Sequence, residues 1–420
     1  MDPATLLIIL ALVFGFYMAW TIGANDVANA FGTVVGSGAV TFFKAVVIAA
    51  IFEFCGAYFA GSHVADTIKS GIVAPKVFEG DALMFARGML AALLAAAIWL
   101  HVATCLGQPV STTHAIIGAV IGFGLFARGP SAIQWGKMGR IAASWFVSPI
   151  VGGILAFLIY LAIRRFVLNS SSPARRARTV APLATALIVM LMLSAALPAL
   201  ARGRASEWVV LVLRWKFLIL LAVGSAIFFY IRRRLSALLT DDDHRDAQLA
   251  TVEKWFSRVQ ILTACNMAFA HGANDVANAI GPIAGILSAS HGTFSAQTQV
   301  PPWLLAFGGF GIVMGLATYG YRVIESIGKK ITEITPSRGL SAEIGTATTV
   351  LVCSLLGLPI STTFVLVGAV MGVGFARGFG AIDLRVIRKI FASWLVTIPV
   401  SALLAIVIYL LMAWLWPIAP

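Results

Sequence analysis

Charge is scarce in this sequence: of 420 residues, 11% are charged, and only 17 are Asp or Glu. Soluble globular domains carry about 25% charged residues, so the composition excludes an ordinary soluble protein. Instead, 60% of the residues are hydrophobic. A membrane span needs about 20 apolar residues. The stretches without Asp, Glu, Lys or Arg cover residues 5–25, 89–127, 141–163, 179–201, 276–321, 344–376 and 390–420. They predict a polytopic, all-α membrane protein.

Cysteine and N-terminal basic residues are also scarce. The four cysteines lie apart in apolar segments with no CxxC spacing, which favours small hydrophobic side chains over a disulfide framework or a metal site. Residues 1–5 contain neither a basic region nor a cleavage site, so we expect the first apolar segment to be retained. The net charge of +13 comes from short loops, where Lys and Arg set topology and meet anionic lipid. We therefore expect a lipid bilayer as partner and no nucleic acid.

Two strings occur twice. GANDVANA stands at residues 23–30 and 272–279, and PVSTT at 109–113 returns as PISTT at 359–363. The separations, 249 and 250 residues, predict two homologous repeats. The predicted division is a first transmembrane repeat over 1–165, two connecting spans with a polar cytoplasmic loop over 166–254, and a second transmembrane repeat over 255–420.

The run 89–127 is too long for one span. As a single helix its 39 residues would reach about 58 Å, against a hydrocarbon core of about 30 Å. The strongest breaker inside it is Gly107-Gln108-Pro109, and the run 344–376 has Gly357-Leu358-Pro359 in the same place. Each run forms either two full spans or a re-entrant hairpin. The Ser-Thr-Thr cluster after each breaker favours the hairpin, because irregular backbone at depth is tolerated where it lines a cavity.

GANDVANA places an ionisable residue in apolar surroundings, which marks a functional site. Gly23 and Gly272 are predicted to unwind the helix, and the Asn-Asp pair after each to cap the helix that resumes. Asn29 and Asn278 follow the aspartates by three residues and so share their helix face. We expect each motif to form half of a binding site that the Ser-Thr-Thr tip of its own repeat completes.

The motifs suit an anion accompanied by a cation. Helix N-termini and hydroxyl groups donate hydrogen bonds to an anion, but Asp26 and Asp275 would repel it. None of the four motifs contains Arg or Lys. A co-bound Na⁺ or H⁺ must therefore supply the positive charge, which is the physical basis of symport. An intramembrane aspartyl protease is a remote alternative, since it would leave both Ser-Thr-Thr clusters unused.

With GANDVANA twice, PVSTTH and PISTTF, the chain resembles the inorganic phosphate transporter family, called PiT, over essentially its whole length. The resemblance implies inverted repeats with broken helices, re-entrant hairpins and about 12 spans, often as homodimers in the cell membrane. It implies import of inorganic phosphate by symport with a cation, Na⁺ favoured over H⁺, with no enzymatic activity and no cofactor beyond the co-transported ion. A sulfate symporter or a metal-phosphate/H⁺ symporter of the same fold is the alternative.

The resemblance also implies site residues. Those expected to bind phosphate are Asp26, Asn29, Ser111, Thr112, Thr113, Asp275, Asn278, Ser361, Thr362 and Thr363. Those expected to bind Na⁺ are Asn25, Asp26, Glu53, Gln108, Asn274, Asp275 and Glu343. Glu53 and Glu343 match two glutamates of the family, and each is a lone carboxylate flanked by apolar residues. Gln108 is added because its amide oxygen could serve a cation at one hairpin only. The sequence gives His271 no firm role.

Overall fold

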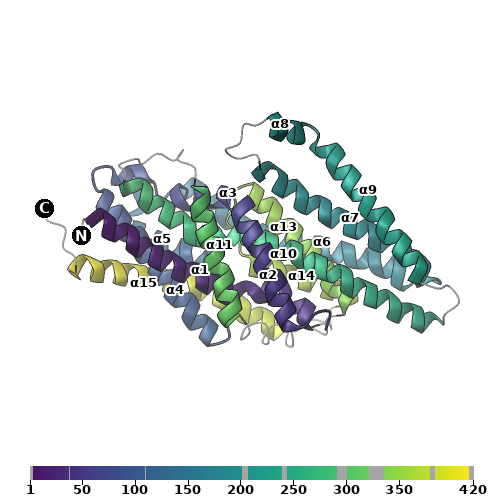
Figure 1. The fold of residues 1–420 in the computed structure, drawn as a ribbon. Coiled ribbons are helices and arrows are strands. Elements are labelled where there is room, and N and C mark those ends of the chain that lie inside the picture. The colour runs from purple at the N-terminus through teal and green to yellow at the C-terminus, as the bar shows by residue number, and fades with distance from the viewer. Residues whose placement is uncertain are drawn as a thin grey trace.

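The computed structural model describes residues 3–36, 38–108, 110–200, 207–238, 244–290, 300–320, 335–378 and 384–415 (Figure 1). Within these ranges the chain is helical, and β-structure is limited to one isolated bridge between Val73 and Ile133. The all-α prediction is confirmed. Pro109 of the first breaker and residues 241–243 of the predicted polar loop lie outside the described residues.

The helices follow the predicted division. The first repeat contains α1 (Pro3–Gly36), α2 (Phe42–Ala60), α3 (Ser62–Ser70), η1 (Pro75–Phe78), α4 (Ala82–Cys105), α5 (Thr112–Arg128), η2 (Pro130–Ala132) and α6 (Trp135–Ile163). The connection contains η3 (Arg164–Leu168), α7 (Pro173–Leu200), α8 (Glu207–Arg214) and α9 (Lys216–Leu238). The second repeat contains α10 (Arg245–Ser290), α11 (Pro302–Tyr319), α13 (Pro336–Leu355), α14 (Thr362–Arg377) and α15 (Leu384–Leu415).

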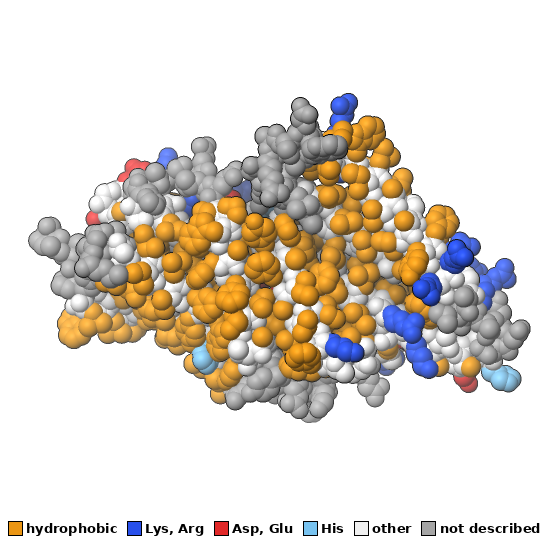
Figure 2. All heavy atoms as spheres, in the orientation of Figure 1, with side chains coloured by type: hydrophobic (Ala, Val, Ile, Leu, Met, Phe, Trp, Pro, Cys, Tyr) orange, Lys and Arg blue, Asp and Glu red, His pale blue; other side chains and the backbone are white. Residues whose placement is uncertain are grey.

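The outer surface is apolar, as in a protein that faces lipid. Hydrophobic side chains cover the middle of the face shown in Figure 2, whereas Lys and Arg gather toward one end. Large side chains such as Phe43, Phe146 and Leu395 are 75%, 68% and 79% exposed, which water would penalise. Seven of the described helices are long and apolar enough to cross a membrane. The chain is therefore a multi-pass membrane protein.

The two predicted breakers form turns between helices. Gly107 and Gly357 adopt positive φ values of 64° and 67°, a conformation that glycine adopts without strain. After each turn a serine caps the next helix: Ser111 accepts a hydrogen bond from the His114 amide at 3.1 Å, and Ser361 from the Phe364 amide at 3.4 Å. α5 and α14 have 17 and 16 residues, about 25 Å, which is shorter than the hydrocarbon core. Their length favours re-entrant hairpins.

The predicted unwinding at GANDVANA is wrong, because both copies lie inside continuous helices, α1 and α10. The glycines serve close packing instead. A Cβ on Gly23 would lie 1.9 Å from the Ile312 carbonyl oxygen, and one on Gly272 would lie 2.1 Å from that of Glu53. Two helices approach so closely only where a side chain is missing, the usual role of glycine between membrane helices.

The repeats interlock. α1 packs on α11 and α10 on α2, while α5 packs on α15 and α14 on α6, so each of these pairs joins one repeat to the other. α1 and α10 run in opposite directions, because Gly15 faces Ile283 whereas Thr33 and Thr263 both reach Glu343. The helices therefore cross near the middle of each GANDVANA motif. This crossing brings residues about 250 positions apart into one place.

Replacing Gly56 or Gly315 with alanine is expected to destabilise the protein. At both positions the new Cβ would lie 1.9 Å from a backbone carbonyl oxygen of the facing helix. Such overpacking costs about 1–3 kcal/mol and outweighs the gain in helix propensity, about 1 kcal/mol. Thermal unfolding in detergent measures the effect. Gly139→Ala is the matched control, since its Cβ would meet nothing within 4 Å, and a common unfolding temperature for all three variants would contradict the close-packing explanation.

Candidate functional site

Three carboxylates meet one imidazole where α1, α2 and α10 come together. His271 Nε2 lies 3.0 Å from Asp275 Oδ2 and 3.9 Å from Asp26 Oδ2, and its Nδ1 lies 3.3 Å from Glu53 Oε1. All four side chains are buried, with exposures of 0–1%. We call Asp26, Glu53, His271 and Asp275 the central cluster. Buried ionisable groups inside a membrane protein are costly, so their concentration marks the site.

The Ser-Thr-Thr tips reach the central cluster from both repeats. Asn29 donates to Thr363 Oγ1 at 2.8 Å and to Asp26 Oδ1 at 3.1 Å. Asn278 donates to the Thr112 and Thr113 hydroxyl oxygens at 3.3 and 3.2 Å. Each asparagine thus contacts the tip of the opposite repeat. The expectation that each motif pairs only with its own tip is wrong, because the antiparallel crossing of α1 and α10 exchanges the partners.

The aspartates complete a single shared site. Thr363 donates to Asp26 Oδ1 at 3.3 Å, across the repeats, whereas Thr362 donates to Asp275 Oδ2 at 3.1 Å within one repeat. The tips also touch each other, since Thr113 Oγ1 donates to the Ile360 carbonyl at 2.9 Å. The structure therefore brings together two aspartates, two asparagines and threonines of both tips. The two serines lie beside them and already act as helix caps.

Asn25 and Asn274 tie the motif helices to the hairpins. Asn25 donates to Thr104 Oγ1 at 2.7 Å, and the Asn274 amide lies 3.1 Å from Ser354 Oγ. Thr104 and Ser354 stand 250 residues apart, so these contacts are equivalent in the two repeats. They fix the hairpins against α1 and α10, beside the central cluster.

Glu343 forms a second buried cluster, away from the first. Thr33 and Gln260 donate to its Oε1 and Thr263 to its Oε2, with the Gln260 contact at 3.1 Å. These partners come from α1 and α10, and Glu343 itself comes from α13. The structure does not bring Gln108 into either cluster: its side chain is exposed in the turn between α4 and α5.

His271 is the main functional residue that the sequence reasoning undervalued. Its signal was present, since it stands four residues before Asp275 and so shares its helix face. The repeat-related residue is Ile22, and Gly23 packs on the Ile312 backbone as Gly272 packs on that of Glu53. An imidazole and a carboxylate on one side thus correspond to two isoleucines on the other. This pair breaks the symmetry of the site.

The arrangement can hold a small cation and an anion side by side. One ligand atom each from Asp26, His271 and Asp275 lies within 4.8 Å of the others, and carboxylate, amide and hydroxyl oxygens are ligands for hard cations. The threonine hydroxyls and asparagine amides can donate to an anion. Both kinds of group occupy the same buried space between the hairpin tips.

Relatives of the chain are named for phosphate. It is 46% identical to inorganic phosphate transporter 2-1, chloroplastic, of Arabidopsis thaliana, over 94% of this chain and 70% of that protein. It is also 46% identical to a putative phosphate permease of Pyrococcus abyssi, over 97% of this chain and 98% of that protein. A solved structure described as the sodium-dependent phosphate transporter matches with a TM-score of 0.89 and 40% identity, over 97% of this chain and 99% of that chain.

A family comparison agrees with these relatives. The family described as Phosphate transporter family matches residues 22–405, which contain both GANDVANA motifs and both tips. The match leaves no basis for the aspartyl protease alternative. The chain belongs to the phosphate transporter family, and it is a transporter rather than an enzyme.

Proposed function

We propose that this protein imports inorganic phosphate by symport with Na⁺. The observation that carries the proposal is the central cluster, where three buried carboxylates lie beside hydroxyl and amide donors from both hairpin tips. An anion site built next to carboxylates works only when cations enter with the anion. Phosphate is chosen because the relatives are named for it, and Na⁺ because the matching solved structure is described as a sodium-dependent transporter.

The charges of the central cluster require more than one cation. Asp26, Glu53 and Asp275 carry three negative charges when ionised, and a protonated His271 removes one. Phosphate adds one or two more. Uncompensated buried charge costs several kcal/mol per ion, which is more than helix ends or neutral donors return. Binding of the anion is therefore linked to the cations, and neither crosses the membrane efficiently alone.

Each group has a defined part in this proposal. A cation binds between Asp26 and Asp275, whose carboxylates are the nearest hard ligands, with the Asn25 and Asn274 side chains beside it. Phosphate accepts hydrogen bonds from the two asparagine amides and from the tip hydroxyls of residues 111–113 and 361–363. His271 holds Glu53 and Asp275 in place, so that the two ends of the site differ. Because donors come from both hairpins, binding of phosphate links the two repeats.

We assign a further cation to Glu343. Its carboxylate, with the side chains of Thr33, Gln260 and Thr263, forms an oxygen-rich cage buried at the junction of α1, α10 and α13. Such ligands suit Na⁺. A lone carboxylate in this position otherwise has no ionic partner among the described residues. Sulfate and a metal-phosphate complex with H⁺ remain the competing cargoes of the same fold, and they are separated by transport assays.

Phosphate uptake into proteoliposomes should depend on an inward Na⁺ gradient. With Na⁺ and pH gradients imposed separately, we expect the Na⁺ gradient to drive accumulation and the pH gradient alone to drive little. Excess unlabelled sulfate should leave the uptake of labelled phosphate unchanged. Uptake indifferent to both gradients would contradict symport, and uptake driven by pH alone would replace Na⁺ by H⁺ in the proposal.

Asp26→Asn and Asp275→Asn should each lower uptake by at least about 100-fold. Breaking a buried charge cluster by removing one member costs about 3–5 kcal/mol, and the cation loses a charged ligand. Uptake is compared at equal reconstituted protein, with size-exclusion profiles to show folding. Asp81→Asn is the control, since Asp81 lies at the surface and pairs with Arg128. Normal uptake by either motif variant would remove that aspartate from the site.

Glu343→Gln should weaken Na⁺ more than phosphate. We expect the Na⁺ concentration for half-maximal uptake to rise about tenfold, because a charged ligand becomes neutral. The KM for phosphate at saturating Na⁺ should change less than about twofold. Gln108→Leu introduces the residue found in the second hairpin, and because Gln108 is exposed, we expect both values to stay at wild type. A selective loss of Na⁺ affinity in Gln108→Leu would restore that residue to the ion site.

A further inference from the structure

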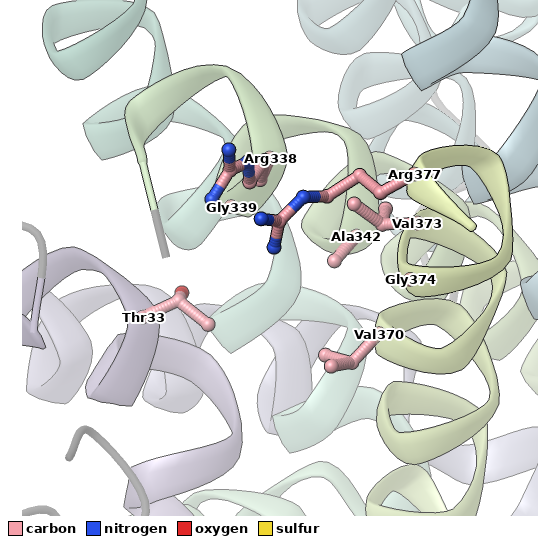
Figure 3. A pocket seen from close by; sticks show the side chains of 8 residues that line it. All are labelled: Thr33, Arg338, Gly339, Ala342, Val370, Val373, Gly374 and Arg377. Atoms are coloured by element: carbon pink, nitrogen blue, oxygen red, sulfur yellow. The ribbon is translucent and has the colours of Figure 1, made fainter. Parts of the chain in front are cut away.

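A narrow pocket lies where the last turns of α1 meet the start of α13 and the end of α14 (Figure 3). Thr33 and small or apolar side chains form its walls, and Arg338 and Arg377 extend into it. The space open to the centre of a water-sized sphere is ≈ 10 Å³, enough for about one water molecule. Neither arginine belongs to the repeated motifs, and the proposed phosphate and cation sites use neither.

Thr33 connects this pocket to the central cluster along one face of α1. Asp26, Asn29 and Thr33 are separated by three and four residues, the spacing of neighbours on a helix surface. Each is at most 2% exposed. Seven residues of helix span about 10 Å. An anion that leaves Asn29 and the hairpin tips therefore meets the Thr33 hydroxyl and then the two guanidinium groups.

The pocket has a positive electrostatic character. Arg377 is exposed and Arg338 half-buried, and the N-terminal turn of α13, which starts at Pro336, adds its amide dipoles. The carboxylates around this end are engaged: Glu253 accepts hydrogen bonds from the backbone and side chain of Ser337 at 3.0 and 2.7 Å, and Glu343 is held in its own cage. Two guanidinium groups in one pocket repel each other, and an anion between them relieves that repulsion.

The corresponding end of the first repeat is closed by aromatic rings. Counting back 250 residues, Arg338 corresponds to Gly88 and Val373 to Phe123. The Phe123 ring packs directly on Gly88, where a Cβ would approach it to 2.0 Å, and it stacks on Phe78 with a centroid distance of 5.5 Å. The same helix junction is thus an apolar plug at one end of the molecule and an arginine-lined pocket at the other.

We propose that the pocket of Thr33, Arg338 and Arg377 is a vestibular anion site, through which phosphate passes between the central cluster and one face of the membrane. The inference rests on the proposed phosphate transport and adds a second binding step to it. In this structure the pocket is too narrow for phosphate, so the structure is closed at this end. Phosphate enters when α14 and the start of α13 separate, and the arginines raise the local concentration of the anion.

Neutralising the arginines should raise the KM for phosphate and leave kcat nearly unchanged. We expect about a threefold to tenfold increase in KM for Arg377→Gln and for Arg338→Gln, with kcat and Na⁺ dependence within about twofold of wild type. Arg128→Gln is the matched control, since Arg128 is the counterpart of Arg377 and lies over the Phe78 ring at the plugged end. Wild-type KM values in both arginine variants and in the double variant would overturn the proposal.

Thiol labelling tests the pocket without transport, and so separates failure of this site from failure of the proposed function. In a variant whose four native cysteines are replaced by alanine, Val370→Cys places a thiol on the pocket wall. In detergent without phospholipid, an anionic methanethiosulfonate should react about tenfold faster than a cationic one. Arg377→Gln should remove the preference, and inorganic phosphate should slow the reaction. Equal rates for the two reagents would overturn the proposal.

A final comparison distinguishes free phosphate from lipid headgroups, which share the same chemistry. Labelling of Val370→Cys is repeated in vesicles of phosphatidylcholine alone and in vesicles with added phosphatidylglycerol. Protection by inorganic phosphate in both kinds of vesicle supports the vestibular site. Protection that requires phosphatidylglycerol and is insensitive to phosphate would assign the pocket to anionic lipid and overturn the proposal.

Discussion

The burial of negative charge at the crossing of α1 and α10 is the constraint on which the site depends. Asp26, Glu53 and Asp275 lie in a space without water access, and His271 is the positive partner that the chain itself supplies. Everything else at this level, the tip hydroxyls, the asparagine amides and the flanking carboxylate cage, serves to make such charge tolerable. A transporter can exploit this cost, because an empty or half-filled site is unfavourable and a fully loaded site is not.

The helix packing explains how such a site remains precise in lipid. Glycines at the crossings let backbones touch, so α1 meets α11 and α10 meets α2 with almost no side chain between them. Bonds across the repeats, such as that from Asn29 to Thr363, then hold both hairpin tips to the same point. Two interlocked repeats thus behave as one structure around the site. The differences between them, the His271–Glu53 contact and the arginine-lined pocket, give direction to an otherwise symmetric arrangement.

The parts of this structure that could be predicted from sequence are those set by local or periodic signals. Apolar length predicted the membrane helices, and Gly107 followed by the Ser111 cap predicted the hairpin turn, because turn and cap are decided within a few residues. The unwinding at Gly23 was predicted wrongly for an equally clear reason. A glycine inside an apolar helix either breaks it or lets another helix approach, and only the facing Ile312 backbone, nearly 290 residues away, decides between the two.

The sequence by itself therefore determined the class of the protein, its two repeats and the residue types of the site, since these follow from composition and from strings duplicated about 250 residues apart. Only the tertiary structure decided which residues meet. It exchanged the tips between the motifs, moved Glu343 into a cage of its own, placed His271 among three carboxylates and left Gln108 outside. Such contacts depend on the direction and depth at which distant helices cross, and no local pattern encodes that geometry.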